Sequence, residues 1–292
     1  MSYGITIGLV CSTGIESDRG GRVANEDNYL VCRKGQVRYR DGDKEVVRPL
    51  DGAGVLVAVA DGMGGHEDGA LAAAAAVQAF SLLFGKGKPQ APELALLRFV
   101  LKAHERLHGT VARRGSVRLG TTLTGAWVLD GRVFWVHVGD SRLYFFRNNT
   151  LVRLTADHTH REFALRDQRP LPPDADRLAQ SFVYGSRGLG DDAGIRVDPG
   201  RDTGSRHLRP GDTLLLCTDG LTGFVDDRRI SDALREVPQP AACAEVLVER
   251  AIAHGSTDNI TAMVVRIDDL PQPVEPHKGG TLAKDVTLVP ED

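Results

Sequence analysis

Residues 123–138, LTGAWVLDGRVFWVHV, decide the fold that the sequence predicts. Two apolar runs in this stretch flank Asp130-Gly131, and Asp-Gly between apolar runs is the strongest short-range signal for a β-hairpin. We therefore expect two antiparallel strands, 123–129 and 132–138. Trp127 and Trp135 lie on these strands and are most simply core side chains.

The rest of the chain supplies further strands and two pairs of helices. Strands are predicted over residues 54–60, 141–147, 151–155, 212–217 and 259–267, and helices over 69–83, 93–113, 226–236 and 241–254. The strands 141–147 and 151–155 flank Asn148-Asn149-Thr150 and form a second hairpin. Because runs of strands and runs of helices follow each other without strict βαβ alternation, the order favours an α+β fold, a sheet sandwich flanked by helices.

Three segments depart from this regular pattern. Residues 160–192 are rich in Pro, Asp and Arg, have weak periodicity, and predict a long surface loop or flap. From Leu270 onward prolines and glycines break any pattern, so we expect one folded domain over 1–268 and a flexible tail over 269–292. Residues 36–53 predict a hairpin that turns around 41–43, to which the sequence assigns no function.

The composition excludes several classes of protein. Of the 292 residues 41% are hydrophobic, enough for a sizeable core and too many for a disordered chain. The 36 Lys and Arg and 39 Asp and Glu leave a net charge of −3. The chain therefore lacks the strongly positive charge with which proteins bind the phosphates of nucleic acids. No apolar run approaches the roughly 18–20 residues of a membrane span. The N-terminus does not read as a signal peptide, so we expect a cytoplasmic protein with no membrane partner.

Four cysteines, Cys11, Cys32, Cys217 and Cys243, are scattered along the chain and never spaced as C-x-x-C. This spacing argues against a zinc site and against a disulfide scaffold. We expect the four thiols to fill core space as small apolar groups.

Five short motifs place an aspartate at the edge of an apolar strand. They are Asn25-Glu26-Asp27, Asp61-Gly62-Met63-Gly64-Gly65-His66, Gly139-Asp140-Ser141-Arg142, Thr218-Asp219-Gly220 and Thr257-Asp258-Asn259. A single motif of this kind is most simply a turn. Five carboxylates gathered at one sheet edge, however, would repel each other unless a cation compensated for their charge. Oxygen ligands suit Mg²⁺ or Mn²⁺, and glycine at position 62 would let its carbonyl face a metal.

Two further side chains near these motifs each allow two interpretations. Arg22, five residues before Asp27, is a solvated surface charge if it stands alone, and a bidentate phosphate clamp if it lies beside an acidic metal site. His66 is most simply a partly buried polar residue, and beside metals it becomes a candidate general acid.

Taken together and in order, these motifs resemble the signature of the metal-dependent protein phosphatases of type 2C, the PPM family, in its bacterial form. The matching elements are R-x-x-N-E-D at 22–27, D-G-M-G-G-H at 61–66, G-T-T at 120–122, V-G-D-S-R at 138–142, L-T-x-D-H at 154–158, T-D-G-L at 218–221 and S-T-D-N-I-T at 256–261. The resemblance covers about residues 4–267. It implies a catalytic domain built as a central antiparallel β-sandwich with pairs of α-helices on both outer faces, a four-layer αββα fold.

The resemblance also implies a site. Two Mn²⁺ or Mg²⁺ ions would be held by Asp27, Asp61, the Gly62 carbonyl, Asp219 and Asp258, with Glu26 supporting that shell and Asp140 helping to hold a third, weaker ion. Arg22 would bind the phosphate. The cations would acidify a water that attacks phosphorus in line, and His66 is the candidate general acid for the leaving alkoxide. The implied partners are proteins phosphorylated on serine or threonine and an opposing Ser/Thr protein kinase.

Other functions stay open at this point. Cys32 and Arg38 form C-x5-R, as in cysteine phosphatases, but the stretch lacks the glycine-rich loop and following helix of a phosphate site. Gly85-Lys86 lacks the other residues of a P-loop. A pseudophosphatase that only binds phosphoproteins would be expected to lose metal carboxylates, and all are present. A phosphoserine-switch phosphatase that acts on a transcription regulator would use the same chemistry. Prolines within 166–176 depart from the usual flap, so substrate preference does not transfer.

Overall fold

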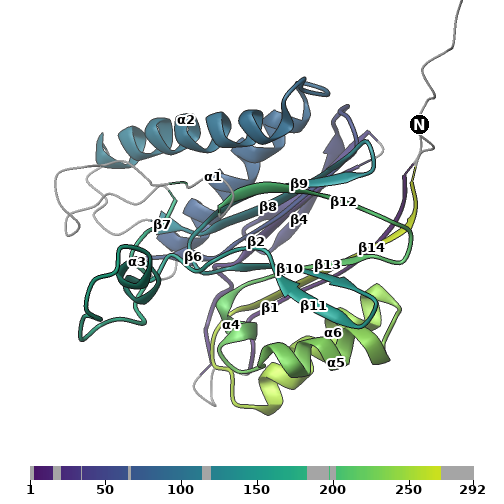
Figure 1. Cartoon of the computed structure of the whole chain (residues 1–292). Coiled ribbons are helices and arrows are strands. Elements are labelled where there is room, and N and C mark those ends of the chain that lie inside the picture. The colour runs from purple at the N-terminus through teal and green to yellow at the C-terminus, as the bar shows by residue number, and fades with distance from the viewer. Residues whose placement is uncertain are drawn as a thin grey trace, which may run out of the picture.

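The computed structural model describes residues 3–15, 21–33, 35–64, 67–113, 120–182, 197 and 202–270 (Figure 1). The expected tail from residue 271, the second part of the expected flap and His66 lie outside the described residues. The boundary between a domain over 1–268 and a tail over 269–292 therefore stays a prediction.

Two antiparallel sheets form the centre of the molecule. The first has five strands in the order β1 (Gly4–Ser12), β14 (Ile260–Asp269), β13 (Thr213–Cys217), β10 (Arg142–Arg147) and β11 (Thr150–Arg153). The second has seven strands in the order β12 (Thr203–His207), β9 (Arg132–Val138), β8 (Leu123–Leu129), β5 (Val55–Ala60), β2 (Asn28–Arg33), β3 (Gln36–Asp41) and β4 (Lys44–Pro49). A short pair, β6 (Gly62–Met63) and β7 (Gly120–Thr121), lies beside them.

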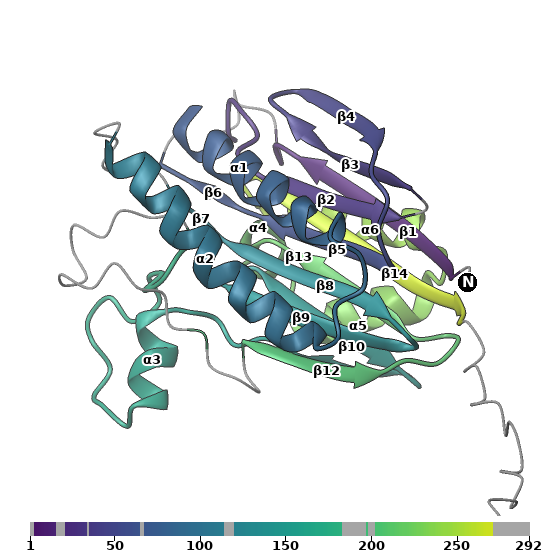
Figure 2. The ribbon, with the colours of Figure 1, turned by 90° about the horizontal axis from the view of Figure 1, so that it is seen from above.

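Helices cover the outer face of each sheet (Figure 1). Helices α1 (Glu67–Phe84) and α2 (Pro92–Arg113) lie side by side over the seven-stranded sheet, as the view from above shows (Figure 2). Helices α4 (Asp219–Thr222), α5 (Asp227–Glu236) and α6 (Pro240–Ala253) cover the five-stranded sheet. The predicted four-layer αββα sandwich is confirmed.

The three apolar layers follow from the sequence pattern of strands and helices. Alternate residues of the fully buried strand β5 face opposite ways, so that Val57 joins the core between the sheets and Leu56 the core under α1. The alanine-rich α1 comes close to the sheet, and the ring of Phe80 lies where a Cβ at position 125 would be. Because Gly125 has no side chain, this ring lies directly against β8.

The predicted hairpins form with the residues that their turns require. Asp130 and Gly131 both have positive φ, 49° and 69°, as a two-residue turn between β8 and β9 demands. Asn148 and Asn149 do the same between β10 and β11, and Thr150, which was expected in the turn, is the first residue of β11. The predicted 36–53 hairpin is the pair β3–β4.

The sequence predicts a long surface loop over residues 160–192, but the structure shows a helix at its start. Its first residues form helix α3 (His160–Arg166), and the Thr159 hydroxyl caps this helix by accepting a hydrogen bond from the backbone N–H of Glu162 at 3.2 Å. A threonine followed three residues later by glutamate is a helix-start signal, which the Pro-rich composition obscured. Strand β12 was also missed, because two of its five residues, Gly204 and Ser205, have low strand propensity.

All four cysteines are free, and Cys32, Cys217 and Cys243 fill the core as expected. Burial raises the pKa of the Cys32 thiol to about 12, and the residue sits mid-sheet opposite Val37, so it is no phosphatase nucleophile. Cys11 differs from the expectation because it is partly exposed. Its sulfur accepts hydrogen bonds from Asn25 and Arg40 and lies 3.2 Å from the Thr261 hydroxyl oxygen.

No helix in the described part of the chain combines the length and the apolarity needed to cross a bilayer.

One buried histidine makes the stability of the fold depend on pH. His137 on β9 is fully buried, its Nε2 donates to the Ala156 carbonyl at 3.0 Å, and its Nδ1 lies 2.9 Å from the Thr124 hydroxyl. Burial, and then the neighbouring His158, lowers the pKa of His137 to about 3. Between this value and about pH 6.5 the unfolded chain binds a proton that the folded chain refuses, so acidification favours unfolding.

We expect wild type to lose stability relative to His137→Gln by about 1.4 kcal/mol for each pH unit below about 6.5. Glutamine does not titrate, so the difference between the two proteins isolates this one group. Urea unfolding of both proteins between about pH 7.5 and pH 4.5 measures it. Parallel stability profiles would contradict the assignment of His137 as a buried neutral imidazole.

Candidate metal and phosphate site

One pocket gathers the acidic motifs that the sequence singled out. It has a volume of about 380 Å³ and lies where loops from both sheets meet. Its lining includes the predicted site residues Arg22, Glu26, Asp61, Gly62, Asp140, Asp219 and Asp258, together with Met63, Gly64, Asp176, Leu178 and Asn259. The structure thus brings together predicted site residues, Arg22 and Asp258, that are 236 positions apart in the chain.

Asp27 is buried, is not among the residues that line the pocket, and is fixed by two threonines. The Thr218 and Thr261 hydroxyls both donate to its Oδ2, at 2.9 and 2.7 Å. Its other oxygen, Oδ1, is buried without a hydrogen-bond partner. A buried carboxylate oxygen in this condition is costly unless a ligand such as a cation occupies its free lone pairs.

Asp61, at the end of β5, is fixed through its backbone. Its N–H donates to the Thr122 hydroxyl at 2.9 Å, and its carbonyl accepts from the Thr122 N–H at 2.8 Å. The same hydroxyl lies 2.7 Å from that of Ser141, the residue after Asp140. Thr122 therefore ties the Asp61 loop to the Asp140 loop.

Two glycines allow the acidic loops to approach each other. A Cβ at Gly62 would clash with the carbonyl oxygens of Gly69 and Glu26, and a Cβ at Gly220 would clash with the carbonyl of Asn259. The Asp61 loop therefore packs on the Glu26 loop, and the Asp219 loop on the Asp258 loop, with no side chain between them.

Burial, and then the charges of neighbouring carboxylates, raises the pKa values of the acidic groups. Burial, and then the charges of Asp219 and Asp258, raise the pKa of Asp27 to about 7, although its hydrogen bonds from the two threonines oppose the shift. Burial, and then Asp219 and Asp157, raise the pKa of Asp140 to about 7. Burial also raises the pKa of Asp61, with Asp27, Asp219 and Asp140 adding to it, and that of Asp219. The pocket therefore concentrates negative charge at a cost in free energy.

Arg22 lines the acidic pocket and contributes a positive charge to it. Its Nε and one terminal nitrogen donate to the two carboxylate oxygens of Asp258, at 2.8 and 3.1 Å. The hydrogen bond to Asp258 raises the pKa of Arg22, and the carboxylates of Glu26 and Asp61 contribute too. The guanidinium fork is exposed and presents the donor geometry that suits a phosphate.

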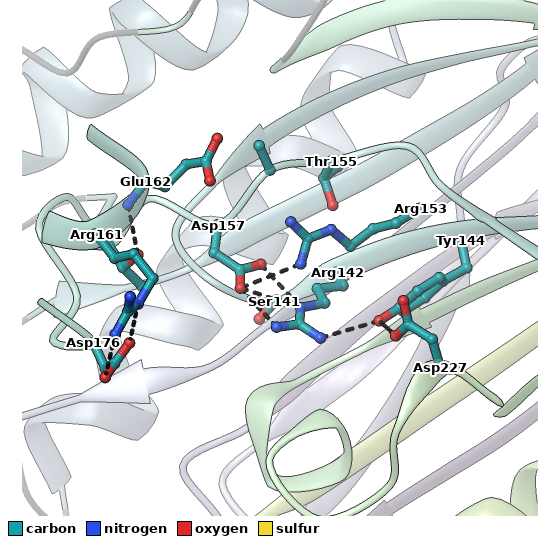
Figure 3. Close-up of polar contacts among 12 residues, drawn as sticks. Ser141, Arg142, Tyr144, Arg153, Thr155, Asp157, Arg161, Glu162, Asp176 and Asp227 are labelled. Atoms are coloured by element: carbon teal, nitrogen blue, oxygen red, sulfur yellow. Dashed lines mark hydrogen bonds and ion pairs between the residues drawn. The ribbon is translucent and has the colours of Figure 1, made fainter. Parts of the chain in front are cut away.

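A second ionic network lies next to Asp140 in the chain and is centred on Arg142 (Figure 3). Arg142 donates to both oxygens of Asp157, at 2.9 and 2.7 Å, and to the buried Tyr144 hydroxyl at 3.2 Å. Tyr144 in turn donates to Asp227 at the start of α5. Figure 3 also shows Arg161 of α3 paired with Asp176, which lines the pocket.

The residues of this pocket fit a hard divalent cation. Within the described ranges no three His, Cys, Asp or Glu side chains are already set as a finished metal site. The donors available are nevertheless all oxygens, and Asp27 Oδ1 and Asp219 Oδ1 are buried without a hydrogen-bond partner. Carboxylate and carbonyl oxygens select Mg²⁺ or Mn²⁺ over zinc. Asp27, Asp61, the Gly62 carbonyl, Asp219 and Asp258 could therefore hold such ions.

The fold and this acidic pocket agree with a known family. The sequence model described as protein phosphatase 2C matches residues 41–252, which is most of the chain. The chain belongs to the protein phosphatase 2C family, as its motifs led us to expect.

Two bacterial phosphatases are similar to this chain in sequence. The serine/threonine protein phosphatase PstP of Mycobacterium tuberculosis is 34% identical over 216 residues, 73% of this chain and 40% of that protein. This chain thus spans less than half the length of PstP. The serine/threonine phosphatase stp of Listeria welshimeri is 30% identical over 237 residues, 80% of this chain and 92% of that one.

Solved structures agree with the fold. The crystal structure of the M. tuberculosis phosphatase PstP/Ppp has a TM-score of 0.69 at 26% identity and covers 91% of this chain and 99% of its own. The PstP catalytic domain in complex with two manganese ions has a TM-score of 0.67 at 28% identity, again over 91% and 99%. PppA of Pseudomonas aeruginosa, a regulatory component of a type VI secretion system, has a TM-score of 0.66 at 27% identity, over 91% and 98%.

Sequence reasoning found the acidic residues and missed the groups that fix them. Thr122, Thr218, Thr261 and Asn259 lie inside the quoted motifs, yet no role was given to them. Asn259 accepts a hydrogen bond from the Glu26 N–H at 2.8 Å and donates to the Ala24 carbonyl at 3.0 Å. A signal was present, because Thr122 and Thr218 adjoin the mostly apolar strands β8 and β13, and Asn259 and Thr261 flank Ile260 at the start of β14.

We expect Mn²⁺ to stabilise the wild-type protein against heat by roughly 5–10 °C when its free concentration is about a hundred times Kd. Asp219→Asn should melt higher than wild type in a chelator, because one repelling charge is gone, and should lose most of the Mn²⁺-dependent shift. Differential scanning calorimetry with and without Mn²⁺ measures both effects.

Asp226→Asn is the matched control for that experiment. Asp226 is an exposed helix cap, and asparagine caps a helix as well as aspartate does. This variant should keep the wild-type shift. An unchanged shift in Asp219→Asn would count against a cation in the pocket.

Proposed function

We propose that this protein hydrolyses phosphoserine and phosphothreonine in proteins, with Mn²⁺ or Mg²⁺ as cofactor. The observation that carries the proposal is that several carboxylates converge at one pocket with an arginine fork, and that Asp27 Oδ1 and Asp219 Oδ1 are buried without a hydrogen-bond partner. Family membership and the two manganese ions bound to the PstP catalytic domain support it.

The proposed ligands are the four aspartates Asp27, Asp61, Asp219 and Asp258, with the Gly62 carbonyl. When bound, the divalent ions would lower the pKa of a water so that it attacks phosphorus in line. The protein holds the carboxylates in place through the Thr218 and Thr261 hydroxyls and the Thr122 backbone contacts. Glu26, which is buried and borders the pocket, supports the ligand shell in this proposal.

Arg22 is the proposed phosphate-binding group, and it also neutralises charge on the transferring phosphoryl group. When Arg22 binds a phosphate, its guanidinium exchanges the Asp258 carboxylate for another anion that can accept two hydrogen bonds. The guanidinium therefore keeps a partner of the same geometry. His66 stays our candidate for the acid that protonates the leaving alkoxide, on the sequence alone.

A third, weaker ion at Asp140 is part of the proposal. Asp140 lines the pocket, and the Asp219 charge contributes to its raised pKa, so it faces the same concentration of negative charge as the other carboxylates. We further propose an opposing Ser/Thr protein kinase as functional partner, by family resemblance only.

Two alternatives use the same pocket. A pseudophosphatase would be expected to have lost metal carboxylates, whereas this sequence keeps each expected carboxylate. A phosphatase for a phosphoserine switch in transcription control differs only in its substrate. Asp176 and Leu178 border the pocket from the segment after α3, so this segment is where such a preference would be set.

Phosphatase activity should require both the divalent metal and its proposed ligands. We expect wild type to hydrolyse p-nitrophenyl phosphate and a phosphothreonine peptide with Mn²⁺, and EDTA to abolish both reactions. Asp219→Asn should lower kcat by at least about a hundredfold, since it removes a ligand from the metal that activates the water.

The exposed variant Asp226→Asn is again the control and should keep the wild-type rate. Steady-state kinetics at saturating Mn²⁺ decide the question. Wild-type turnover in EDTA, or in Asp219→Asn, would refute the proposed chemistry.

Arg22→Ala should raise KM for a phosphopeptide by roughly tenfold or more, the worth of a lost charge-assisted hydrogen bond. Its effect on kcat should be smaller, because the clamp binds the ground state and the transition state alike. Arg229→Ala removes an exposed arginine that is paired with Asp226 and serves as control. An unchanged KM in Arg22→Ala would contradict the phosphate assignment.

A further inference from the structure

His158, the last residue of the L-T-x-D-H motif, is fully buried and has no role in the proposed chemistry. We propose that it is a positioning residue, which holds the Gly139–Asp140 peptide in place and ties the segment after α3 to the same point. The proposal rests on the proposed function, because Asp140 matters there as the ligand of the third ion.

His158 makes two hydrogen bonds to the backbone of Gly139. Its backbone N–H donates to the Gly139 carbonyl at 2.6 Å, and its ring Nδ1 accepts from the Gly139 N–H at 3.2 Å. Gly139 has a φ of 114°, and a Cβ at this position would clash with Thr122. The residue before Asp140 therefore owes its placement to these two contacts and not to a side chain of its own.

These contacts also fix the tautomer of His158. A backbone N–H can only donate, so Nδ1 carries no proton in the neutral ring and Nε2 carries it. Nε2 lies 3.0 Å from Asp202 Oδ1, and both side chains are fully buried. The Asp202 carbonyl accepts from the His137 N–H at 2.8 Å, which holds Asp202 against β9. The contact of Nε2 with Asp202 Oδ1 lies outside hydrogen-bond geometry, so the tautomer is set at Nδ1 by the Gly139 N–H.

The segment after α3 meets the same histidine. The Gln180 side chain lies 2.9 Å from His158 Nδ1, and the His158 carbonyl accepts from the Ala179 N–H at 2.7 Å. Thr159 and Leu178 form an adjacent β-bridge, and the Leu178 side chain lines the pocket. One residue thus joins the wall that would face a substrate to the backbone that carries Asp140.

Two substitutions separate the contacts of this ring. The amide of glutamine reaches the place of Nε2, so His158→Gln keeps a donor toward Asp202 and loses the acceptor for Gly139. The amide oxygen of asparagine reaches the place of Nδ1, so His158→Asn keeps the acceptor for Gly139. His137→Gln is the matched control, because His137 is equally buried with its ring centre 4.8 Å away and its ring bonds go to Thr124 and Ala156 instead.

The measurement is the number and affinity of bound Mn²⁺, by calorimetric titration and by the electron paramagnetic resonance signal of free Mn²⁺. We expect His158→Gln to weaken the weakest class of sites roughly tenfold and to leave the tighter classes unchanged. His158→Asn and His137→Gln should stay within about threefold of wild type. Asp140→Asn should lose the weakest class, and adding His158→Gln to it should change nothing more, because both act on one site.

Several results would overturn the proposal. One is a His158→Gln titration equal to that of His137→Gln, and another is a loss of Mn²⁺ affinity in His158→Asn as large as that in His158→Gln. The others are a further loss of affinity when His158→Gln is added to the Asp140→Asn protein, and a wild type that binds only two Mn²⁺ ions. If His158→Gln does not fold, His158→Leu, which also lacks the acceptor for Gly139, replaces it in the same titration and should weaken the weakest class roughly tenfold. Wild-type activity on a phosphopeptide tests the proposed function separately, so an active wild type with an unaltered His158→Gln titration refutes the role of His158 alone.

Discussion

The architecture of the site depends on holding mutually repelling carboxylates close together. Burial and neighbouring charges raise the pKa values of Asp27, Asp61, Asp140 and Asp219, so the arrangement opposes folding rather than driving it. Threonine hydroxyls and backbone groups at the ends of buried strands resist this repulsion. Because these strands belong to both sheets, the packed sandwich prevents the carboxylates from moving apart. The fold thus prepares in advance the charge that a cation would neutralise.

Much of this could be predicted from local sequence. Asp130-Gly131 and Asn148-Asn149 specify hairpins because they adopt positive φ without help from the rest of the chain. The convergence of Asp61, Asp140 and Asp219 was also predictable, since loops at the ends of sandwich strands meet at a few edges. The order of seven motifs then pointed to the protein phosphatase 2C family, which the match over residues 41–252 confirms.

The parts that could not be predicted depend on long-range contacts. Nothing local to Thr261 or Thr218 says that both hydroxyls bind Asp27, because this requires β14 and β13 to lie beside each other. The role proposed for His158 likewise needs Gly139, Gln180 and Asp202 to meet around one ring. Helix α3 was missed for a different reason, since prolines after it masked the Thr159 cap. The role of His66 stays a prediction.

The pairing of β1 with β14 joins the two ends of the described chain, and Thr6 bonds Asp268 across 262 positions. Thr261, on this last strand, completes the environment of Asp27, and Arg22 meets Asp258 just before it. A ribosome must therefore release nearly the whole domain before the pocket can close. Contacts of such wide sequence separation form slowly, so the nascent chain remains without a finished pocket while it is being synthesised.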